Sequence, residues 1–179
     1  MSNSNARSYL SVILFAVAIC EPLQAADDAV RVVPESDLKS WWQAGESLTP
    51  PRYPIDALKS GAEGCVAVAF EIHSDGSVSN ERVWRKQLSA GTDSALKLLE
   101  QSALLAVHQW NYVPAPTNAV RSPVYTYAVI TFTLTEGYRS PERAKIKDAE
   151  FKAKCEMPDF PQQVQAMINA GTAAKGGTQ

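Results

Sequence analysis

The fold is decided by residues 64–72, which read Gly-Cys-Val-Ala-Val-Ala-Phe-Glu-Ile. Alternate side chains in this stretch are large and apolar: Val66, Val68, Phe70 and Ile72. A period of two is typical of a β-strand with one face in a hydrophobic core. The outward positions between them are small rather than charged: Cys65, Ala67 and Ala69. The second face of the sheet therefore also needs a cover, and the C-terminal part of the chain is the candidate.

Further elements follow on both sides of this strand. Residues 74–76, Ser-Asp-Gly, predict a turn, and the extended run 77–85 predicts the second strand of a hairpin. Apolar residues at intervals of three and four predict an amphipathic helix from Thr92 to near Trp110, and residues 55–60 predict a short helix. Residues 125–134 alternate again and predict a third strand. We therefore expect an α+β fold, a small antiparallel three-stranded sheet with two helices on one face, followed by a helical C-terminal extension.

The N-terminus is typical of an export signal. A polar start, an apolar run over residues 9–20 and a small-residue site ending at Ala25 predict a signal peptide that is cleaved after Ala25. The apolar run is shorter than the about 20 residues that span a bilayer, although an uncleaved membrane anchor is the alternative. We expect four segments: signal peptide 1–25, linker or N-terminal segment 26–50, domain 51–135, and helical extension 136–179 with a disordered end.

Composition excludes several classes of function. The chain has 179 residues, 45% of them hydrophobic, which is enough for one modest core. Its net charge of −2 lacks the strong positive field that draws proteins to nucleic acid. After export two cysteines remain, Cys65 and Cys155, and we hypothesise a disulfide that holds the extension against the sheet. The sequence has no Cys-x-x-Cys pair and no histidine cluster, so we predict no metal and no cofactor.

No catalytic constellation is visible, and we predict that the protein is not an enzyme. His73 and Asp75 flank the hairpin turn, where polar residues serve the conformation of the backbone. His108 lies opposite the apolar stripe of its helix and is expected to be exposed, and neither histidine is expected near another recognisable group. Trp41 and Trp42 are expected to pack on the domain rather than to meet a partner.

An ordered set of short motifs resembles the C-terminal domain of the TonB family. The motifs are Arg52-Tyr53-Pro54, the strand 64–72, Asp75-Gly76-Ser77-Val78, Trp110-Asn111-Tyr112-Val113-Pro114-Ala115, and residues 130–134. Together they extend over about 84 residues, 51–134. The resemblance implies a domain in the periplasm of a Gram-negative bacterium, with strand order second, first, third. It also implies that the third strand lies at an edge and pairs with an extended segment of an outer-membrane receptor in transmembrane transport.

Residue by residue, the resemblance covers Tyr53 and Pro54, which match the family's Gln-Tyr-Pro segment near the receptor contact, with Arg52 in place of Gln. It also covers the edge strand. The predicted partner-binding residues are Arg52, Tyr53, Pro54, Tyr125, Tyr127, Val129 and Thr131. Residues 124–135 contain no Lys, Arg, Asp, Glu or Pro to discourage pairing at that edge.

The resemblance carries over the binding fold rather than energy transduction. TonB proteins have an uncleaved N-terminal helix that contacts an inner-membrane motor, followed by a long Pro-rich spacer. Residues 1–50 match neither feature, so we expect no direct contact with the motor here. The alternative function is a structural or scaffolding envelope module that binds another periplasmic protein. Pairing of the edge with the C-terminal tail, or with a second copy in a homodimer, also stays open.

Overall fold

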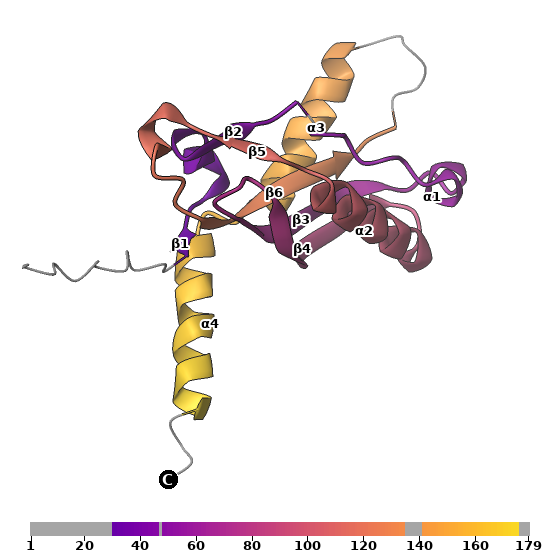
Figure 1. The fold of residues 1–179 in the computed structure, drawn as a ribbon. Helices are drawn as coiled ribbons and strands as arrows, with labels where there is room; N and C mark the ends of the chain where they lie inside the picture. The colour runs from indigo at the N-terminus through magenta and orange to yellow at the C-terminus, as the bar shows by residue number, and fades with distance from the viewer. Residues whose placement is uncertain (1–29, 47, 135–140, 176–179) are drawn as a thin grey trace, which may run out of the picture.

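The strand that dominates the sequence forms β3 (Glu63–Ile72) and lies inside a four-stranded sheet (Figure 1). The structure, a computed structural model, describes residues 30–46, 48–134 and 141–175. The strand order is β1-β6-β3-β4. The other strands are β1 (Arg31–Val32), β4 (Val78–Ala90) and β6 (Val124–Phe132). Because β3 pairs antiparallel with both β4 and β6, the predicted order of the three long strands is confirmed.

The prediction of a purely antiparallel, three-stranded sheet is wrong because of β1. This strand pairs parallel with β6, with Arg31 opposite Val124 and Val32 opposite Tyr125. The sheet is therefore mixed, and the start of β6 is not an edge. Two residues are too few to show a period of two, so the sequence alone gave no reason to separate β1 from a linker.

The hairpin of β3 and β4 turns at Gly76, whose φ of +86° is one that residues with a Cβ rarely adopt. A Cβ at this position would also collide with the carbonyl oxygen of Tyr112. The register shifts within the pair between Ala67 and Val68 and again between Ala69 and Glu71. These irregularities break the alternation of β4, which ends at Ala90 and not near residue 85 as the pattern predicted.

Two helices cover one face of the sheet. They are α1 (Ile55–Lys59) and α2 (Asp93–His108), which pack against each other. The hydroxyl of Thr92 accepts a hydrogen bond of 3.3 Å from the backbone N–H of Ala95, and this side-chain cap starts α2. Its end at His108 is close to the predicted end near Trp110, ahead of two prolines.

The first core lies between these helices and β3. Its strand residues are Val66, Val68, Phe70 and Ile72, and its α2 residues include Ala95, Leu99, Ala103 and Val107. The ring of Phe70 meets Trp110 edge to face and stacks on Tyr112, both with centroids 6.0 Å apart. Such aromatic pairs stabilise a core beyond the area that they bury. The period-two residues therefore lie where the sequence placed them.

The N-terminal segment forms part of the folded body. It contains η1 (Glu35–Ser40) and β2 (Trp42–Ala44), and β2 pairs antiparallel with β5 (Tyr112–Pro114), which precedes η2 (Pro116–Asn118). Trp42 is buried and its indole N–H donates to the Ser122 carbonyl at 3.1 Å. Trp41 is partly buried against the same core, with the guanidinium of Arg31 above its ring. Both tryptophans pack on the domain, as predicted.

Two further helices, α3 (Pro141–Cys155) and α4 (Phe160–Lys175), follow the sheet. Residues from α3, α4 and the link between them build a second core against Cys65, Ala67, Ala69 and Tyr127. Cys65 and Cys155 form a disulfide, with their Cα atoms 6.1 Å apart. The cover that the small residues of β3 called for is thus present, and Figure 1 shows α2 and α3 on opposite sides of the sheet.

Candidate partner-binding edge

The outer edge of β6 presents the backbone groups of alternate residues. The N–H of Val33 donates to the carbonyl oxygen of Tyr125 at 2.9 Å, so the polar groups of Tyr125 face away from β3. Because a strand alternates which neighbour its residues face, Tyr127, Val129 and Thr131 face the same way. These four residues are the ones that the sequence selected on this strand.

The first of these positions is already occupied. β1 pairs with residues 124–125, and the N–H of Arg31 reaches the Pro123 carbonyl at 3.3 Å. The occupant at these two positions is the chain's own N-terminal segment, which was not among the alternatives that the sequence analysis considered for this edge. At Tyr125, therefore, a partner strand cannot pair unless β1 leaves.

Beyond β1, the side chain of Glu35 contacts the outer edge of β6 at Val129. Its carboxylate accepts from the backbone of Val129 and pairs with the ammonium of Lys152 at 3.1 Å. Burial raises the pKa of the Glu35 carboxyl above its ordinary value, and the nearby charge of Glu156 adds to this. The hydrogen bonds and charge of Lys152 and the Val129 backbone act in the opposite direction. An acid thus stands where the carbonyl of a neighbouring strand would be.

A hollow of about 660 Å³ opens beside this part of β6. It is lined by residues of β6, of the N-terminal segment and of the end of α3, among them Tyr127, Ala128, Trp42, Leu48, Lys152 and Glu156. The hollow combines apolar walls with charged residues of both signs at its rim. A cavity of this kind can take a short peptide segment.

The end of β6 is fastened by α3. Asp148 accepts hydrogen bonds from the hydroxyls of Thr131 at 3.1 Å and Thr133 at 3.0 Å. Glu63 accepts from the N–H of Leu134 and pairs with Lys147 at 3.1 Å. The available length of the edge is therefore the stretch from Tyr127 to Thr131.

The rings of the two tyrosines on β6 pack against the C-terminal part of the chain. Tyr125, which is half-buried, stacks on Phe160 and meets Trp84, while the hydroxyl of the buried Tyr127 accepts from the Met157 N–H at 3.1 Å. Burial is the main cause that raises the pKa of both phenols. Their rings belong to the second core, and what they offer to a partner is backbone.

The motif Arg52-Tyr53-Pro54 lies at the other end of β6. The Tyr53 ring packs edge to face on Phe132 at 5.5 Å, and its hydroxyl donates to the Ala62 carbonyl. Burial, and then the charge of Glu63, raises the pKa of Tyr53 to about 12. Arg52 and Pro54 line a separate hollow of about 590 Å³ against α2. The motif is therefore not brought together with Tyr125 and Tyr127 in one site.

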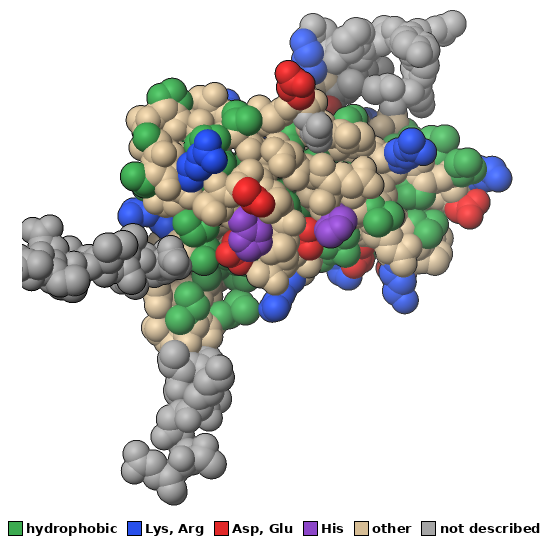
Figure 2. Space-filling view, viewed as in Figure 1, with side chains coloured by type: hydrophobic (Ala, Val, Ile, Leu, Met, Phe, Trp, Pro, Cys, Tyr) green, Lys and Arg blue, Asp and Glu red, His purple; other side chains and the backbone are tan. Residues whose placement is uncertain are grey.

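The histidines differ from the expectation that neither has a recognisable neighbour. His73 lies 2.6 Å from the Ser79 hydroxyl and 3.5 Å from a carboxylate oxygen of Glu71, and His108 lies 2.9 Å from Glu81. Figure 2 shows both histidines beside acidic side chains on one face. The register of the hairpin brings these side chains together by placing Glu71 opposite Ser79, and the register shift just before Glu71 was not visible in the sequence. The row Ser79, His73, Glu71 stays within the hairpin, and we assign it to hairpin stability.

Two further observations concern metals and membranes. Within residues 30–46, 48–134 and 141–175, no group of three His, Cys, Asp or Glu side chains is arranged to hold a metal ion. No helix in the part of the chain that the structure describes is long and apolar enough to cross a bilayer. The predicted signal peptide and its cleavage site lie outside the described residues.

Comparison with known proteins gives one family. No curated protein matches the chain. Among solved structures, the TonB C-terminal domain of Pseudomonas aeruginosa is 20% identical with a TM-score of 0.44, over 58% of this chain and 95% of that one. A TonB C-terminal domain of Helicobacter pylori is 32% identical with a TM-score of 0.35, over 48% of this chain and 71% of that one. Because these TM-scores are below 0.5, the assignment rests on the sequence.

The sequence match covers residues 49–134, which fit the family described as Gram-negative bacterial TonB protein C-terminal. These residues include α1, the strands β3 to β6 and α2, with the Arg52-Tyr53-Pro54 motif at their start. The two segments that flank them, β1 with η1 and β2 on one side and α3 with α4 on the other, lie outside the match. Through residues 49–134 the chain belongs to the TonB C-terminal domain family.

Proposed function

We propose that this domain binds an extended segment of another envelope protein, which adds as a strand to the outer edge of β6. The partner is an outer-membrane receptor segment, and the process is TonB-dependent transport. Membership of the TonB C-terminal family supports the class of partner. The binding mode draws its support from the edge itself, which carries outward backbone groups and no charged residue or proline over residues 124–135.

The observation that carries this proposal is the stretch from Tyr127 to Thr131 beside its hollow, where β1 no longer pairs with β6 and the Glu35 carboxylate meets the backbone at Val129. Strand addition draws affinity from main-chain hydrogen bonds and specificity from pockets for alternate side chains. Here the outward groups of Tyr127 and Thr131 supply the first, together with those of Val129 once the partner replaces the Glu35 carboxylate, and the hollow of about 660 Å³ supplies the second. Lys152 and Glu156 at its rim give the partner's charges something to meet.

We place the mature protein in the periplasm, after cleavage of the signal peptide behind Ala25. The disulfide of Cys65 and Cys155 fits this location, because such bonds persist in oxidising compartments. N-terminal sequencing of the protein isolated from the envelope tests the cleavage. A mature protein that still begins at Met1 would place the domain on an inner-membrane anchor instead.

The test of the binding mode uses two neighbouring proline substitutions, Val129→Pro and Ile130→Pro. The N–H of Val129 faces the Glu35 carboxylate and not β3, so its loss should remove that one contact, spare the sheet and abolish pairing with a partner. Ile130 lies opposite Val66 of β3, and proline there should disrupt the sheet. Binding is measured by fluorescence anisotropy with labelled peptides that cover the periplasm-facing segments of the bacterium's outer-membrane receptors, and folding by thermal melting.

We expect wild type to bind at least one receptor peptide. Val129→Pro should show a cooperative melting transition close to that of wild type and should not bind this peptide. Ile130→Pro should melt at a clearly lower temperature than wild type. If wild type binds none of these peptides, or if folded Val129→Pro binds as well as wild type, strand addition at β6 is the wrong mechanism.

One observation favours the second candidate, a structural envelope module that needs no added strand. β1 already closes the start of the edge, and α3 fastens its end. Co-purification from the envelope separates the two functions. Receptors among the bound proteins support strand addition, whereas cell-wall or secretion components without receptors support the structural module.

A further inference from the structure

The N-terminal segment occupies the β6 edge in the manner of a bound peptide. It runs parallel to β6 and adds two residue pairs, Arg31 with Val124 and Val32 with Tyr125. Its N–H groups at Arg31 and Val33 donate across to β6. Main-chain pairing along an edge strand is the contact that a partner strand would make in trans.

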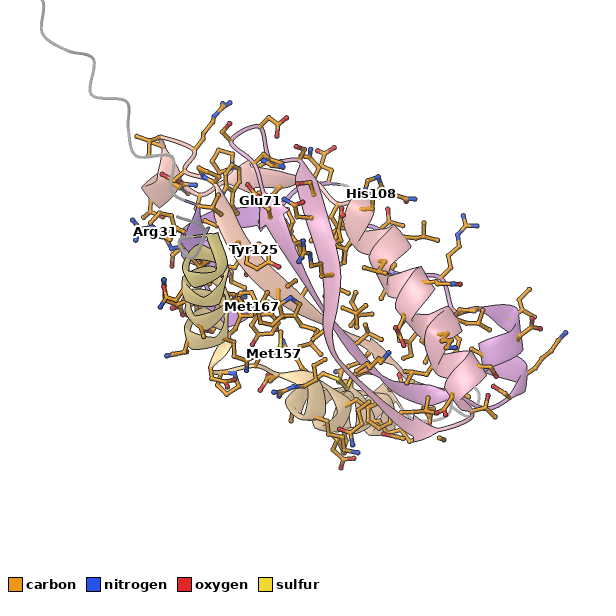
Figure 3. All side chains as sticks on the ribbon, turned by 90° about the horizontal axis from the view of Figure 1, so that it is seen from below. Arg31, Glu71, His108, Tyr125, Met157 and Met167 are labelled. Carbon is orange, nitrogen blue, oxygen red and sulfur yellow. A yellow bond between two sulfur atoms is a disulfide. The ribbon has the colours of Figure 1, made fainter. Side chains whose placement is uncertain are left out.

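Side chains of the segment alternate between the two faces of the sheet. Val33 is 3% exposed and belongs to the first core, on the same face as Arg31, whose guanidinium lies 4.5 Å above the Trp41 ring. Val32 packs on the second core, and with Val30 it lines a hollow of about 310 Å³. Tyr125 and Met167 of α4, both labelled in Figure 3, line the same hollow. Side chains of the segment therefore make contacts on both faces of the sheet.

Glu35 fixes the register of the segment. It follows Val33 by two residues, accepts from the Val129 backbone and pairs with Lys152 of α3. With Val32 opposite Tyr125, the carboxylate of Glu35 lies at the backbone of Val129. The segment therefore has a strand, a buried anchor and an acid in a defined order.

The segment nevertheless pairs with β6 over a short length. Only Arg31 and Val32 are paired as a strand. Arg31 is exposed and Val32 is partly exposed. A short strand with solvent on one side opens more easily than the interior pairing of β3 with β6, which extends over nine residue pairs.

We propose that residues 30–35 are a resident occupant of the β6 edge, which an incoming partner strand displaces and whose chemistry the partner shares. The partner segment runs parallel to β6, carries apolar side chains at the positions of Val30, Val32 and Val33, and carries an acid at the position of Glu35. This inference rests on the proposed function for the source of the partner. The occupancy of the edge stands without it.

The experiment measures exchange with the chain's own sequence. A labelled peptide of residues 30–37, Val-Arg-Val-Val-Pro-Glu-Ser-Asp, is titrated into the full-length protein and followed by fluorescence anisotropy. The variant Val33→Pro removes the N–H that donates to Tyr125 and leaves the edge open. Its matched control is Val32→Pro, because the N–H of Val32 faces away from β6.

We expect the peptide to bind Val33→Pro at least about tenfold more tightly than wild type, since a closed edge lowers the apparent affinity by the fraction of open molecules. Val32→Pro should stay closer to wild type, and a peptide of scrambled order should bind none of the proteins. Glu35→Ala, which keeps the strand and loses the acid, should give a smaller gain in the same direction. It serves as the opening variant if Val33→Pro does not fold.

Equal affinity of the peptide for wild type, the folded opening variant and Val32→Pro would overturn the inference. Receptor peptides distinguish this from failure of the proposed function. If the peptide of residues 30–37 binds as expected and no receptor peptide binds any variant, the occupancy of the edge by residues 30–35 is supported and the proposed receptor binding is contradicted. If receptor peptides bind wild type and Val33→Pro alike, without competition from the peptide of residues 30–37, the resident strand is not displaced.

Discussion

The contacts of Glu35 with the β6 edge require its carboxylate to be buried, which disfavours the charged form. The carboxylate accepts from the Val129 backbone and holds Lys152, yet burial raises its pKa above the ordinary value. A carboxyl whose pKa is raised on folding binds its proton more strongly in the folded state. Its contribution to stability is therefore largest below the pKa of the unfolded chain and is lost as the pH rises through the folded pKa.

This sign gives a prediction for Glu35→Gln. The amide keeps an oxygen for the Val129 N–H and carries no charge to bury. The free energy of unfolding of Glu35→Gln, minus that of wild type, should become more positive between about pH 4 and pH 7, where carboxyls titrate. Urea unfolding at several pH values measures it. Lys152 and Glu156 face Glu35 in both proteins. A difference that is flat or falls with pH contradicts the account.

Among the helices and strands, the sequence predicted those in which apolar residues recur at a regular interval. β3 and α2 were found because each repeats apolar residues over several turns or pleats, and both are present at nearly the predicted bounds. The strands β1, β2 and β5 contain two or three residues, too few for any pattern, and tertiary contacts alone define them. The same limit hid part of the candidate site, because the edge strand was predicted and its occupant was not.

The C-terminal extension was predicted as a cover, and Phe160, the first residue of α4, lies in the second core that it forms. Its buried ring lies 5.0 Å from Trp84 and 4.9 Å from Tyr127, centroid to centroid. Phe160→Ala should lower the free energy of unfolding by about 3–5 kcal/mol, as for other buried aromatic residues. Met167→Ala, on the same helix at an exposed position, should change it by less than about 0.5 kcal/mol. Urea denaturation measures both, and similar values for the two variants would show that α4 does not depend on this anchor.

The whole molecule is a sheet with a core on each face, and the two cores are held in different ways. Helices α1 and α2 flank the hairpin of β3 and β4 in the sequence and pack by hydrophobic burial. The second layer comes from the distant C-terminal part, and Cys155 of α3 ties it to Cys65 near the start of β3. Small residues on the outer face of β3 leave room for this layer, which is why they were informative in the sequence.

The last prediction concerns this tie. The disulfide joins residues 90 apart, and closing so long a loop restricts the unfolded chain by about 4 kcal/mol in the chain-entropy account. The variant Cys65→Ala/Cys155→Ala and wild type under reductant should both lose stability of that order in urea unfolding, because the second core of Phe151, Met157 and Phe160 remains but its attachment does not. Intact-mass analysis after thiol blocking, with and without reductant, provides the control, and two blocked thiols in the untreated periplasmic protein contradict the bond. Equal stability of the oxidised and reduced protein would mean that hydrophobic packing alone keeps the second layer on the sheet.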